Sequence, residues 1–339
     1  LVELEGVIED VWWVDVRYGG TGRGAAPAKV APSMLSTSVL ALLDLPPLRP
    51  EDDALVIYGA VAPARAADAW PGAAIYKSVD GGASYDSVLA TRGRATLGAT
   101  TTVLGDWSGG NRWDRADTVR VALTSGTFSS ASELAVYNGA NAVAIGDEII
   151  QFANAVLVSP GEWELSTLLR GRIGTERAIA GHAVGDRVVL LSPALRALAL
   201  PAGELGRARL YKAVTGGQPI ADAPSQTFAA AGNSLRPLSP VRIRGSRSGG
   251  DLTITWVRRA RLYRGWHVPL DEPVEAYEID ILSGSSVVRT LTASAPIVVY
   301  TAAQQTADFG APQPEGTVPV AIHMISSRVG RGHAGTATL

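Results

Sequence analysis

The stretch Leu252-Thr253-Ile254-Thr255-Trp256 decides the fold class, because large apolar residues alternate in it with threonines. Side chains of a β-strand point alternately to opposite faces, so Leu252, Ile254 and Trp256 share one face and the two threonines share the other. The stretch therefore predicts a strand with one face in a hydrophobic core.

The same alternation recurs further along the chain, at 277–281 and at 318–324, and turn residues lie between these segments. Seven short strands are predicted in this part of the chain, at 241–244, 252–258, 276–282, 287–292, 296–300, 318–326 and 335–339. Short strands separated by turns in this number are typical of a β-sandwich of the immunoglobulin or fibronectin type III kind.

Glycine (37 residues) and proline (20 residues) recur throughout the chain at intervals that suit short strands joined by turns, and the residues before the sandwich also carry β patterning. Gly146-Asp147 between two apolar runs predicts a β-hairpin over 141–152, and Gly185-Asp186 predicts a turn before a strand at 187–191. The other elements predicted here are strands at 1–18, 54–61, 73–78, 118–123 and 207–214, a glycine-rich loop at 19–24, a short helix at 33–43 and a connector at 221–236.

The chain has 339 residues, which is too many for one ordinary core, and we expect three regions. Residues 1–95 form an N-terminal β-rich segment with the glycine-rich loop. Residues 96–236 form a β-rich domain followed by the connector, and residues 237–339 form the sandwich. The predicted fold class is therefore mainly β, with several β-rich modules that end in a fibronectin type III-like β-sandwich.

The composition excludes several classes of function. The absence of cysteine excludes disulfides, thiolate metal sites and cysteine nucleophiles. The formal net charge of -2 gives no bulk attraction to nucleic acid or to anionic membranes. The apolar stretch 188–200 contains Pro193 and Arg196 and is too short to span a membrane. No signal peptide follows Leu1, so we expect a soluble piece of a longer or processed protein.

Two segments resemble fibronectin type III domains. Residues 252–256 resemble the second strand of these domains, with its core tryptophan. Arg-Val-Gly-Arg-Gly at 328–332 resembles the glycine-bearing turn before their last strand. The tyrosine usual at the entry to the sixth strand is missing, so we expect no tyrosine corner.

Three further signatures resemble the tail-tip host-specificity proteins of tailed phages and of gene transfer agents, which are phage-like particles. They are Ala-Trp-Pro-Gly-Ala at 69–73 with Ser-Val-Asp-Gly-Gly at 78–82, Leu-Leu-Arg-Gly-Arg-Ile-Gly-Thr-Glu at 168–176 with His182, and Val-Arg-Thr-Leu at 288–291 with residues 300–310. The three occur in the same order as in that family. The chain is most similar to the C-terminal part of the very large "megatron" tail protein of gene transfer agents.

The resemblance implies a structural component of a tail tip, or baseplate, at the distal end of the tail of an extracellular phage-like particle. Region 96–236 then resembles a tail hub, and the chain is expected to form a homotrimer. The implied partners are other baseplate and tail proteins (hub, distal tail protein and fibres), a host cell-surface glycan and DNA in transient passage. The implied roles are host attachment, host recognition and DNA ejection, with no enzyme activity, no cofactor, no metal and no stable membrane insertion.

The remaining motifs favour structural interpretations. Residues 20–25 have the letters of a dinucleotide-binding fingerprint, but Pro27 and Pro32 disfavour the helix that must follow. Residues 78–85 resemble one Asp-box hairpin of sialidase-like propellers, which predicts a structural turn. A glycosidase needs two carboxylates that face each other across about 5–9 Å, whereas adjacent acids are usually solvated turn residues. The adjacent acids here are Asp114 with Asp117, Asp147 with Glu148, Glu162 with Glu164, and Asp271 with Glu272.

One cluster of basic and aromatic residues follows the predicted strand 252–258 and is the candidate contact site. Such side chains suit a neighbouring subunit, sugar rings or the phosphates of lipopolysaccharide. The alternative is a surface of ion pairs with Asp271, Glu272 and Glu275. The cluster comprises Arg258, Arg259, Arg261, Tyr263, Arg264 and Trp266.

Two other functions remain as alternatives. A glycan-binding or cell-wall glycan-hydrolase accessory module would bind a specific saccharide or release fragments from peptidoglycan. A secreted adhesin built from similar sandwiches would be a monomer without ring-forming partners.

Overall fold

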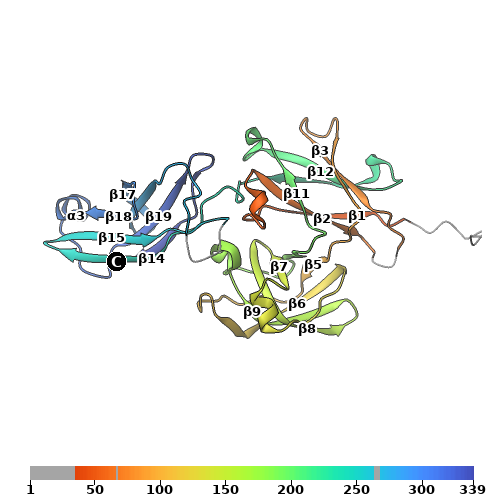
Figure 1. Cartoon of the computed structure of the whole chain (residues 1–339), viewed down its shortest axis with the longest axis horizontal. Coiled ribbons are helices and arrows are strands. Elements are labelled where there is room, and N and C mark those ends of the chain that lie inside the picture. The colour runs from red at the N-terminus through yellow and green to blue at the C-terminus, as the bar shows by residue number, and fades with distance from the viewer. Residues whose placement is uncertain (1–34, 66–67, 263–267) are drawn as a thin grey trace, which may run out of the picture. The chain divides into compact units, whose positions relative to one another are not determined.

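The computed structural model describes residues 35–65, 68–262 and 268–339, and the structural statements below refer to these residues. The chain separates into two compact units, Leu1–Leu35 and Ser36–Leu339. The strand predicted at 1–18 and the glycine-rich loop at 19–24 lie outside the described residues. The second unit is mainly β, as the sequence predicts (Figure 1).

Two antiparallel sheets are built from strands that lie far apart in the sequence. The three-stranded sheet has the order β1 (Ser38–Leu43), β2 (Val56–Pro63) and β11 (Arg196–Ala199). The four-stranded sheet has the order β13 (Ser225–Ala229), β12 (Ala208–Thr215), β3 (Ala73–Ser78) and β4 (Asp86–Thr91). Ile57, Ile75 and Tyr211 are among the side chains of both sheets that meet in one buried cluster.

The strands that lie between β4 and β11 in the sequence form a closed barrel with the strand order β10-β5-β6-β9-β8-β7. The predicted hairpin is confirmed, since Ile145 pairs with Glu148 across a turn that begins at Gly146, where φ is 57°. Helix α2 (Glu133–Tyr137) lies between β6 and β7. The barrel strands are β5 (Leu97–Thr100), β6 (Trp113–Ser125), β7 (Ala142–Ile145), β8 (Glu148–Ser159), β9 (Glu162–Leu169) and β10 (Arg187–Leu190).

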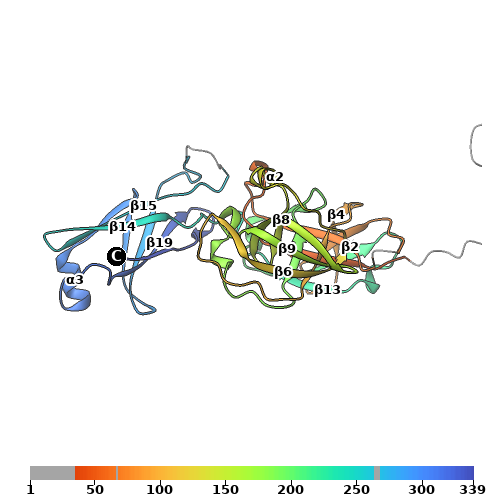
Figure 2. The same ribbon diagram turned by 90° about the horizontal axis from the view of Figure 1, so that it is seen from below.

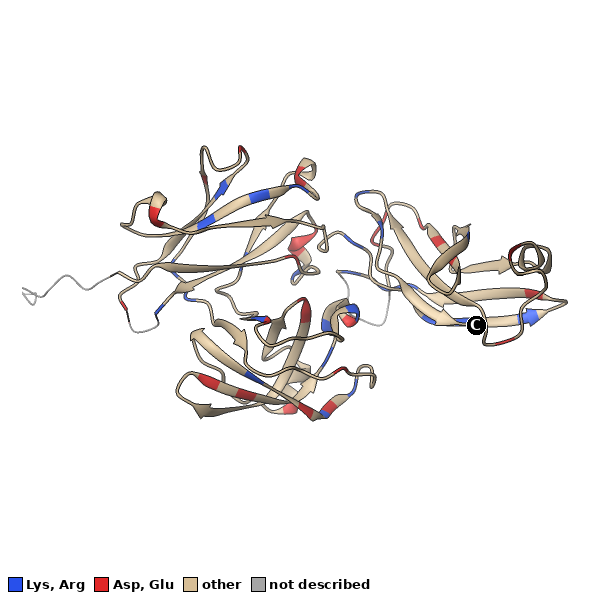
Figure 3. Cartoon of the chain, turned by 180° about the vertical axis from the view of Figure 1, so that it is seen from behind, with Lys and Arg blue, Asp and Glu red and all other residues tan. Residues whose placement is uncertain are grey.

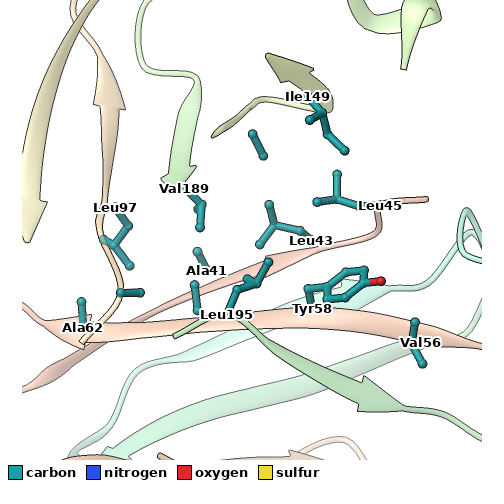
Figure 4. Close-up of a cluster of buried hydrophobic side chains, with 13 residues drawn as sticks. Ala41, Leu43, Leu45, Val56, Tyr58, Ala62, Leu97, Ile149, Val189 and Leu195 are labelled. Atoms are coloured by element: carbon teal, nitrogen blue, oxygen red, sulfur yellow. The ribbon is translucent and has the colours of Figure 1, made fainter. Parts of the chain in front are cut away.

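The barrel and the three-stranded sheet share a hydrophobic core. Leu43 and Tyr58 of the sheet belong to the same buried cluster as Leu97, Val189 and Ile149 of the barrel (Figure 4). Each of these side chains is at most 4% exposed. Separating the barrel from the sheet would expose this apolar surface to water, so we expect the two to behave as one body.

The residues from Val241 onward form two further sheets with the strand order of a fibronectin type III domain. One sheet has the order β14 (Val241–Ser248), β15 (Asp251–Val257) and β18 (Ile297–Tyr300). The other contains β17 (Ser286–Ala293), β16 (Tyr277–Ser283) and β19 (Pro319–Ser326), and both β20 (Gly330–Arg331) and β21 (Gly335–Thr338) pair with β19. The seven predicted strands are confirmed, and Ile254, Trp256 and Ile279 lie in the core between the sheets.

Helix α3 (Ala302–Phe309) is an element of the sandwich that the sequence patterns do not predict. It begins after Thr301, whose hydroxyl oxygen caps it, and ends at Gly310, where φ is 83°. The buried Gln305 side chain donates to the carbonyl oxygen of Gly250 at 3.0 Å. This bond ties α3 to the turn between β14 and β15 (Figure 2).

Two predicted elements are wrong. Residues 38–43 form strand β1 instead of a helix, and none of their side chains is exposed, so no two-sided pattern distinguishes the strand from a helix. The predicted connector 221–236 contains strand β13, which pairs with β12. In addition, β11 pairs with β2 and β12 pairs with β3, so the regions predicted at 1–95 and 96–236 share sheets.

The described loops contain short 3-10 helices, and no helix in the described residues has the length and apolar character needed to cross a membrane. The 3-10 helices are η1 (Pro50–Asp52), η2 (Arg172–Gly174), η3 (Glu176–Ala178), η4 (Ala202–Glu204) and η5 (Ile220–Asp222).

Replacing Trp256 with alanine should lower the free energy of unfolding by about 3–5 kcal/mol, because the substitution leaves a cavity in the sandwich core. Trp256 is 4% exposed, and its ring packs edge-on against Tyr277 with the centroids 5.0 Å apart. Trp256→Phe is the matched control, since it keeps an aromatic ring at this contact and should cost less. Urea unfolding followed by circular dichroism measures both, and equal losses would contradict the prediction.

Candidate functional site

Residues 168–176, which resemble tail-tip proteins, end strand β9 and continue into a turn with left-handed backbone. Gly171, Ile173 and Gly174 have φ values of 60°, 59° and 82°. Glycine adopts this conformation readily, whereas the β-branched side chain of Ile173 makes it costly. A Cβ atom on Gly171 would also lie 2.8 Å from the side chain of Ile179. The turn therefore requires glycine at this position.

Next to this turn, Arg170 forms a buried ion pair with Glu148, the first residue of β8. Arg170 Nη2 donates to Glu148 Oε2 at 2.9 Å, and Nε donates to Oε1 at 3.0 Å. Both side chains are fully buried. The backbone N–H of Gly171 also donates to Glu148, and the carbonyl oxygens of Gly105 and Ile179 accept the other guanidinium hydrogens. The two buried charges therefore compensate each other and are satisfied by hydrogen bonds.

His182 connects this ion pair to the turn before β10. Its Nε2 atom lies 2.8 Å from Glu148 Oε2, and its Nδ1 atom lies 2.8 Å from Asp186 Oδ2. The pKa of His182 is raised above its ordinary value, mainly by the hydrogen bond to Glu148. Burial lowers this pKa, and the hydrogen bond to Asp186 raises it further. Two carboxylates therefore favour the protonated imidazole.

Asp114, near the start of β6, lies on the other side of the guanidinium. Its Oδ2 atom is 3.5 Å from Arg170 Nη1, and its side chain is fully buried. Burial raises the pKa of the neighbouring Asp117, and the hydrogen bond and negative charge of Asp114 raise it further. We call the connected residues the barrel charge network: Asp114, Glu148, Arg170, His182 and Asp186.

The barrel charge network joins the starts of β6 and β8, the end of β9 and the turn before β10. The side chains of Glu148, Arg170 and His182 are at most 4% exposed. Their polar atoms bind each other and nearby backbone, so the arrangement suits stabilisation of the barrel better than proton transfer to a bound molecule.

This network is not predicted from the sequence, although three of its residues stand in informative positions. Arg170 and His182 fall in the segment that resembles tail-tip proteins. Glu148 follows the hairpin turn directly and precedes Ile149 and Ile150, so its carboxylate lies at the edge of an apolar run. A charged residue that begins a buried strand is a signal for a buried partner.

Only Asp114 and Asp117 among the adjacent acids lie in direct contact, and in the other three pairs each carboxylate has a partner of its own. These partners are Arg187 for Asp147, Arg170 for Glu148, Thr101 for Glu162, Arg120 for Glu164, the backbone N–H of Arg261 for Asp271, and Ser327 for Glu272.

The turn predicted at 78–85 is confirmed as the connection between β3 and β4. Asp80 Oδ1 accepts from the backbone N–H of Ser84 at 3.0 Å, and Oδ2 accepts from the Ser84 hydroxyl at 2.6 Å. The hydrogen bonds from Ser84, together with one from Ser78, hold the pKa of Asp80 well below its ordinary value. The carboxylate therefore stabilises its own hairpin.

The described arginines of the candidate contact site have partners within the chain. Arg258 pairs with Glu275 at 3.2 Å, as the ion-pair alternative predicts. Arg259 pairs with Glu176 at 2.8 Å. Arg261 is 2% exposed, pairs with Asp53 at 3.2 Å and donates to the carbonyl oxygen of Ser234 at 2.7 Å. Tyr263, Arg264 and Trp266 lie outside the described residues. Contact of this cluster with a subunit or a glycan stays a prediction.

Charged residues of both signs are interspersed along the strands and loops (Figure 3). This pattern agrees with the net charge of -2 and gives no extended field of one sign. Over the described part of the chain, no group of three or more histidine, aspartate or glutamate side chains is placed to hold a metal ion.

Comparison with protein families gives a match at residues 95–189 to the family described as Rcc01698-like, C-terminal. The family is related to gene transfer agents. The matched residues coincide with the barrel, β5 to β10, and contain the whole barrel charge network. The match supports a relation to phage-like particles through the barrel. A comparison with curated proteins found no match.

Three solved structures show partial similarity. Domains d3–d4 of the rat CD45 extracellular region are 14% identical over 43% of this chain and 70% of theirs, with a TM-score of 0.23. The central fibronectin-III array of RIM-binding protein is 11% identical over 71% of this chain and 67% of its own, with a TM-score of 0.19. The chicken interferon gamma receptor alpha chain is 10% identical over 70% of this chain and 96% of its own, with a TM-score of 0.20. These TM-scores are too low to support a fold assignment. The sandwich is assigned to the fibronectin type III fold from its strand order alone.

Arg170→Met should lower the free energy of unfolding by about 3–5 kcal/mol, because it leaves the buried Glu148 carboxylate without its counterion. The matched control is Arg120→Met, which breaks the pair with Glu164 on the same barrel, where the two side chains are 48% and 33% exposed. That change should cost no more than about 1 kcal/mol. Urea unfolding of both variants tests the comparison, and equal losses would contradict the structural role of Arg170.

The stability that His182 contributes should fall as the pH rises above 6.5. Its pKa is raised in the folded chain from the ordinary value of 6.5, so the folded state holds this proton more tightly than the unfolded state. The contribution is complete below the unfolded pKa and is lost as the pH passes the folded pKa. His182→Gln cannot bind the proton and serves as the reference.

Unfolding free energies of the wild type and His182→Gln, measured from about pH 5.5 to about pH 9, test this expectation. The advantage of the wild type should shrink with rising pH. An advantage that stays constant or grows would show that the proton on His182 does not stabilise the fold.

Proposed function

We propose that this chain is a structural component of the tail tip, or baseplate, of a phage-like particle. The observation that carries the proposal is the family match at 95–189, which relates the barrel to a family associated with gene transfer agents. The three signatures that resemble tail-tip host-specificity proteins support the distal end of the tail as its location. The particle acts outside the cell that produces it.

The positions of these signatures in the fold support a structural role. Residues 168–176 form the barrel turn beside Arg170, and residues 78–82 begin the hairpin that Asp80 stabilises. In the third signature, Arg289 on β17 forms two hydrogen bonds with Asp308 of α3, at 2.6 and 2.8 Å. The residues behind the resemblance therefore determine turns and fasten elements, as expected where shape is the functional property.

The proposed mechanism is mechanical. Three copies assemble around the tail axis and bind other baseplate and tail proteins, namely the hub, the distal tail protein and the fibres. The assembly presents a surface to the host envelope, including its glycans, and rearranges so that DNA passes. A barrel and sheet that share a core suit this role because they transmit force as one body. The proposal includes no enzyme activity, no cofactor and no metal.

Electron cryo-microscopy of the intact particle tests this proposal. The expected result is density for the barrel and the sandwich at the distal end of the tail, in three copies around the axis. Particles made without this chain are the control and should lack that density. Density on the head, or particles that do not contain the chain, would contradict the proposal, and another copy number would contradict the trimer.

A second measurement separates this role from that of a glycan hydrolase. Purified chain incubated with peptidoglycan or capsular glycan should release no soluble fragments, with a known lytic enzyme as the positive control. Release that is abolished by Asp117→Asn would overturn the assignment, because Asp117 has a raised pKa beside a second carboxylate.

A further inference from the structure

A cavity of about 890 Å³ lies within the unit Ser36–Leu339. Three parts of the chain line it: the barrel, which contributes Gln151, the sheet that contains β2, which contributes Tyr58, and the segment after β15, which contributes Arg259. Pockets that bind small molecules have volumes of about 300–1,000 Å³, so the cavity is large enough for a ligand of several rings. Neither Asp114 nor Asp117 lines it.

The charge of the lining is one-sided. It contains four arginines and no aspartate or glutamate among its described residues: Arg49, Arg172, Arg259 and Arg261. Arg259 and Arg261 have carboxylate partners that lie outside the lining, Glu176 and Asp53. Arg172 differs from these two, since no carboxylate of the described residues lies within ion-pair distance of its guanidinium.

Neutral amides hold the guanidinium of Arg172. Its Nε atom donates to Gln151 Oε1 at 2.9 Å, and its Nη1 atom donates to Asn111 Oδ1 at 2.5 Å. Gln151 is itself fixed, because its amide nitrogen donates to the carbonyl oxygens of Val136 and Ala140. The guanidinium is therefore held in place, and its Nη2 group has no acceptor among the described residues.

This placement leaves a partly buried positive charge without a contacting counterion. Burial lowers the pKa of Arg172, while the more distant charge of Glu176 opposes that effect. Desolvation of a cation is unfavourable unless a paired anion compensates it. An anion bound in the cavity would supply this compensation and would gain charge-assisted hydrogen bonds from a planar donor.

The backbone at this site is also unfavourable by itself. Ile173, the next residue, lines the cavity and has φ 59° and ψ 33°, a left-handed conformation that β-branched residues rarely adopt. The turn from Gly171 to Gly174 thus holds the Arg172 side chain in its hydrogen bonds to Gln151 and Asn111, although the left-handed backbone of Ile173 is unfavourable in free energy. Strain of this kind concentrates at binding sites.

The other lining groups indicate the class of ligand. The amides of Asn111 and Asn138 and the phenol of Tyr137 offer polar contacts, while the partly exposed Ile173 and Leu191 offer apolar ones. Hydroxyl edges and C–H faces occur together in sugars, which suit such a mixed lining. We infer that this cavity binds a small acidic saccharide, whose carboxylate or phosphate group is held by Arg172.

Asn111→Asp gives the sharpest test of this inference. It places a carboxylate next to the Arg172 guanidinium, at an amide that already accepts a hydrogen bond from it. The built-in anion should stabilise the fold, or leave its stability unchanged, and should weaken binding of an acidic ligand. Arg172→Gln removes the cation, and Arg244→Gln on the exposed face of β14 is the control with the same change of charge.

The measurement is isothermal titration calorimetry of the full 339-residue chain with four probes. Trigalacturonate carries carboxylates, glucose 6-phosphate carries a phosphate, maltotriose is neutral, and inorganic phosphate has no sugar. We expect at least one acidic sugar to bind more tightly than maltotriose and inorganic phosphate, and the one that binds identifies the anionic group. Asn111→Asp and Arg172→Gln should each weaken it by about tenfold or more, whereas Arg244→Gln should not.

Several outcomes would overturn the inference. These are no binding of either acidic sugar to the folded wild-type chain, equal binding of maltotriose or of inorganic phosphate, and unchanged affinity in folded Asn111→Asp. The titration uses the isolated chain and requires no particle, so its failure would leave the proposed structural role intact.

Discussion

The buried ion pair between Arg170 and Glu148 is the interaction on which the barrel depends. Two opposite charges lie where water cannot reach them, and each is satisfied by the other and by backbone groups. A pair of this kind contributes little net stability, but loss of one partner leaves a charge that the interior cannot solvate. The backbone N–H of Gly171, in the glycine-bearing turn after β9, and the imidazole of His182, before β10, both contact Glu148 of this pair.

A hydrophobic core shared by the barrel and the three-stranded sheet joins the barrel to the neighbouring strands. The barrel occupies the sequence between β4 and β11. The strands that follow it, β11 and β12, pair with β2 and β3, which precede it. Because of this pairing, we expect the segment 36–236 to unfold as a single cooperative structure. The sandwich is built from the later residues, with its own core. This organisation suits a part whose function is to keep its shape under load.

Arginine illustrates how differently the same side chain is used along this chain. In the barrel, Arg170 is neutralised by direct contact with a carboxylate. In the segment that follows β15, Arg261 is buried, pairs with Asp53 and donates to the carbonyl oxygen of Ser234. Arg172 is held by amides alone and faces a cavity. Of these three arginines, only Arg172 has no carboxylate partner and could pair with an anionic ligand. The surroundings of each arginine, and not its residue type, therefore distinguish a structural role from a binding role.

The sequence by itself determined the strands of the sandwich and the hairpin at Gly146, because a period of two and a turn dipeptide are properties of neighbouring residues. It did not determine that 38–43 is a strand, since a segment without an exposed face has no periodic pattern. Only the tertiary structure decided which strands pair and which charges are buried. Asp147 and Glu148 are adjacent, yet one is exposed and the other is enclosed. The physical reason is that burial and compensation of charge depend on partners distant in sequence, 22 positions apart for Arg170 and Glu148 and 208 for Arg261 and Asp53.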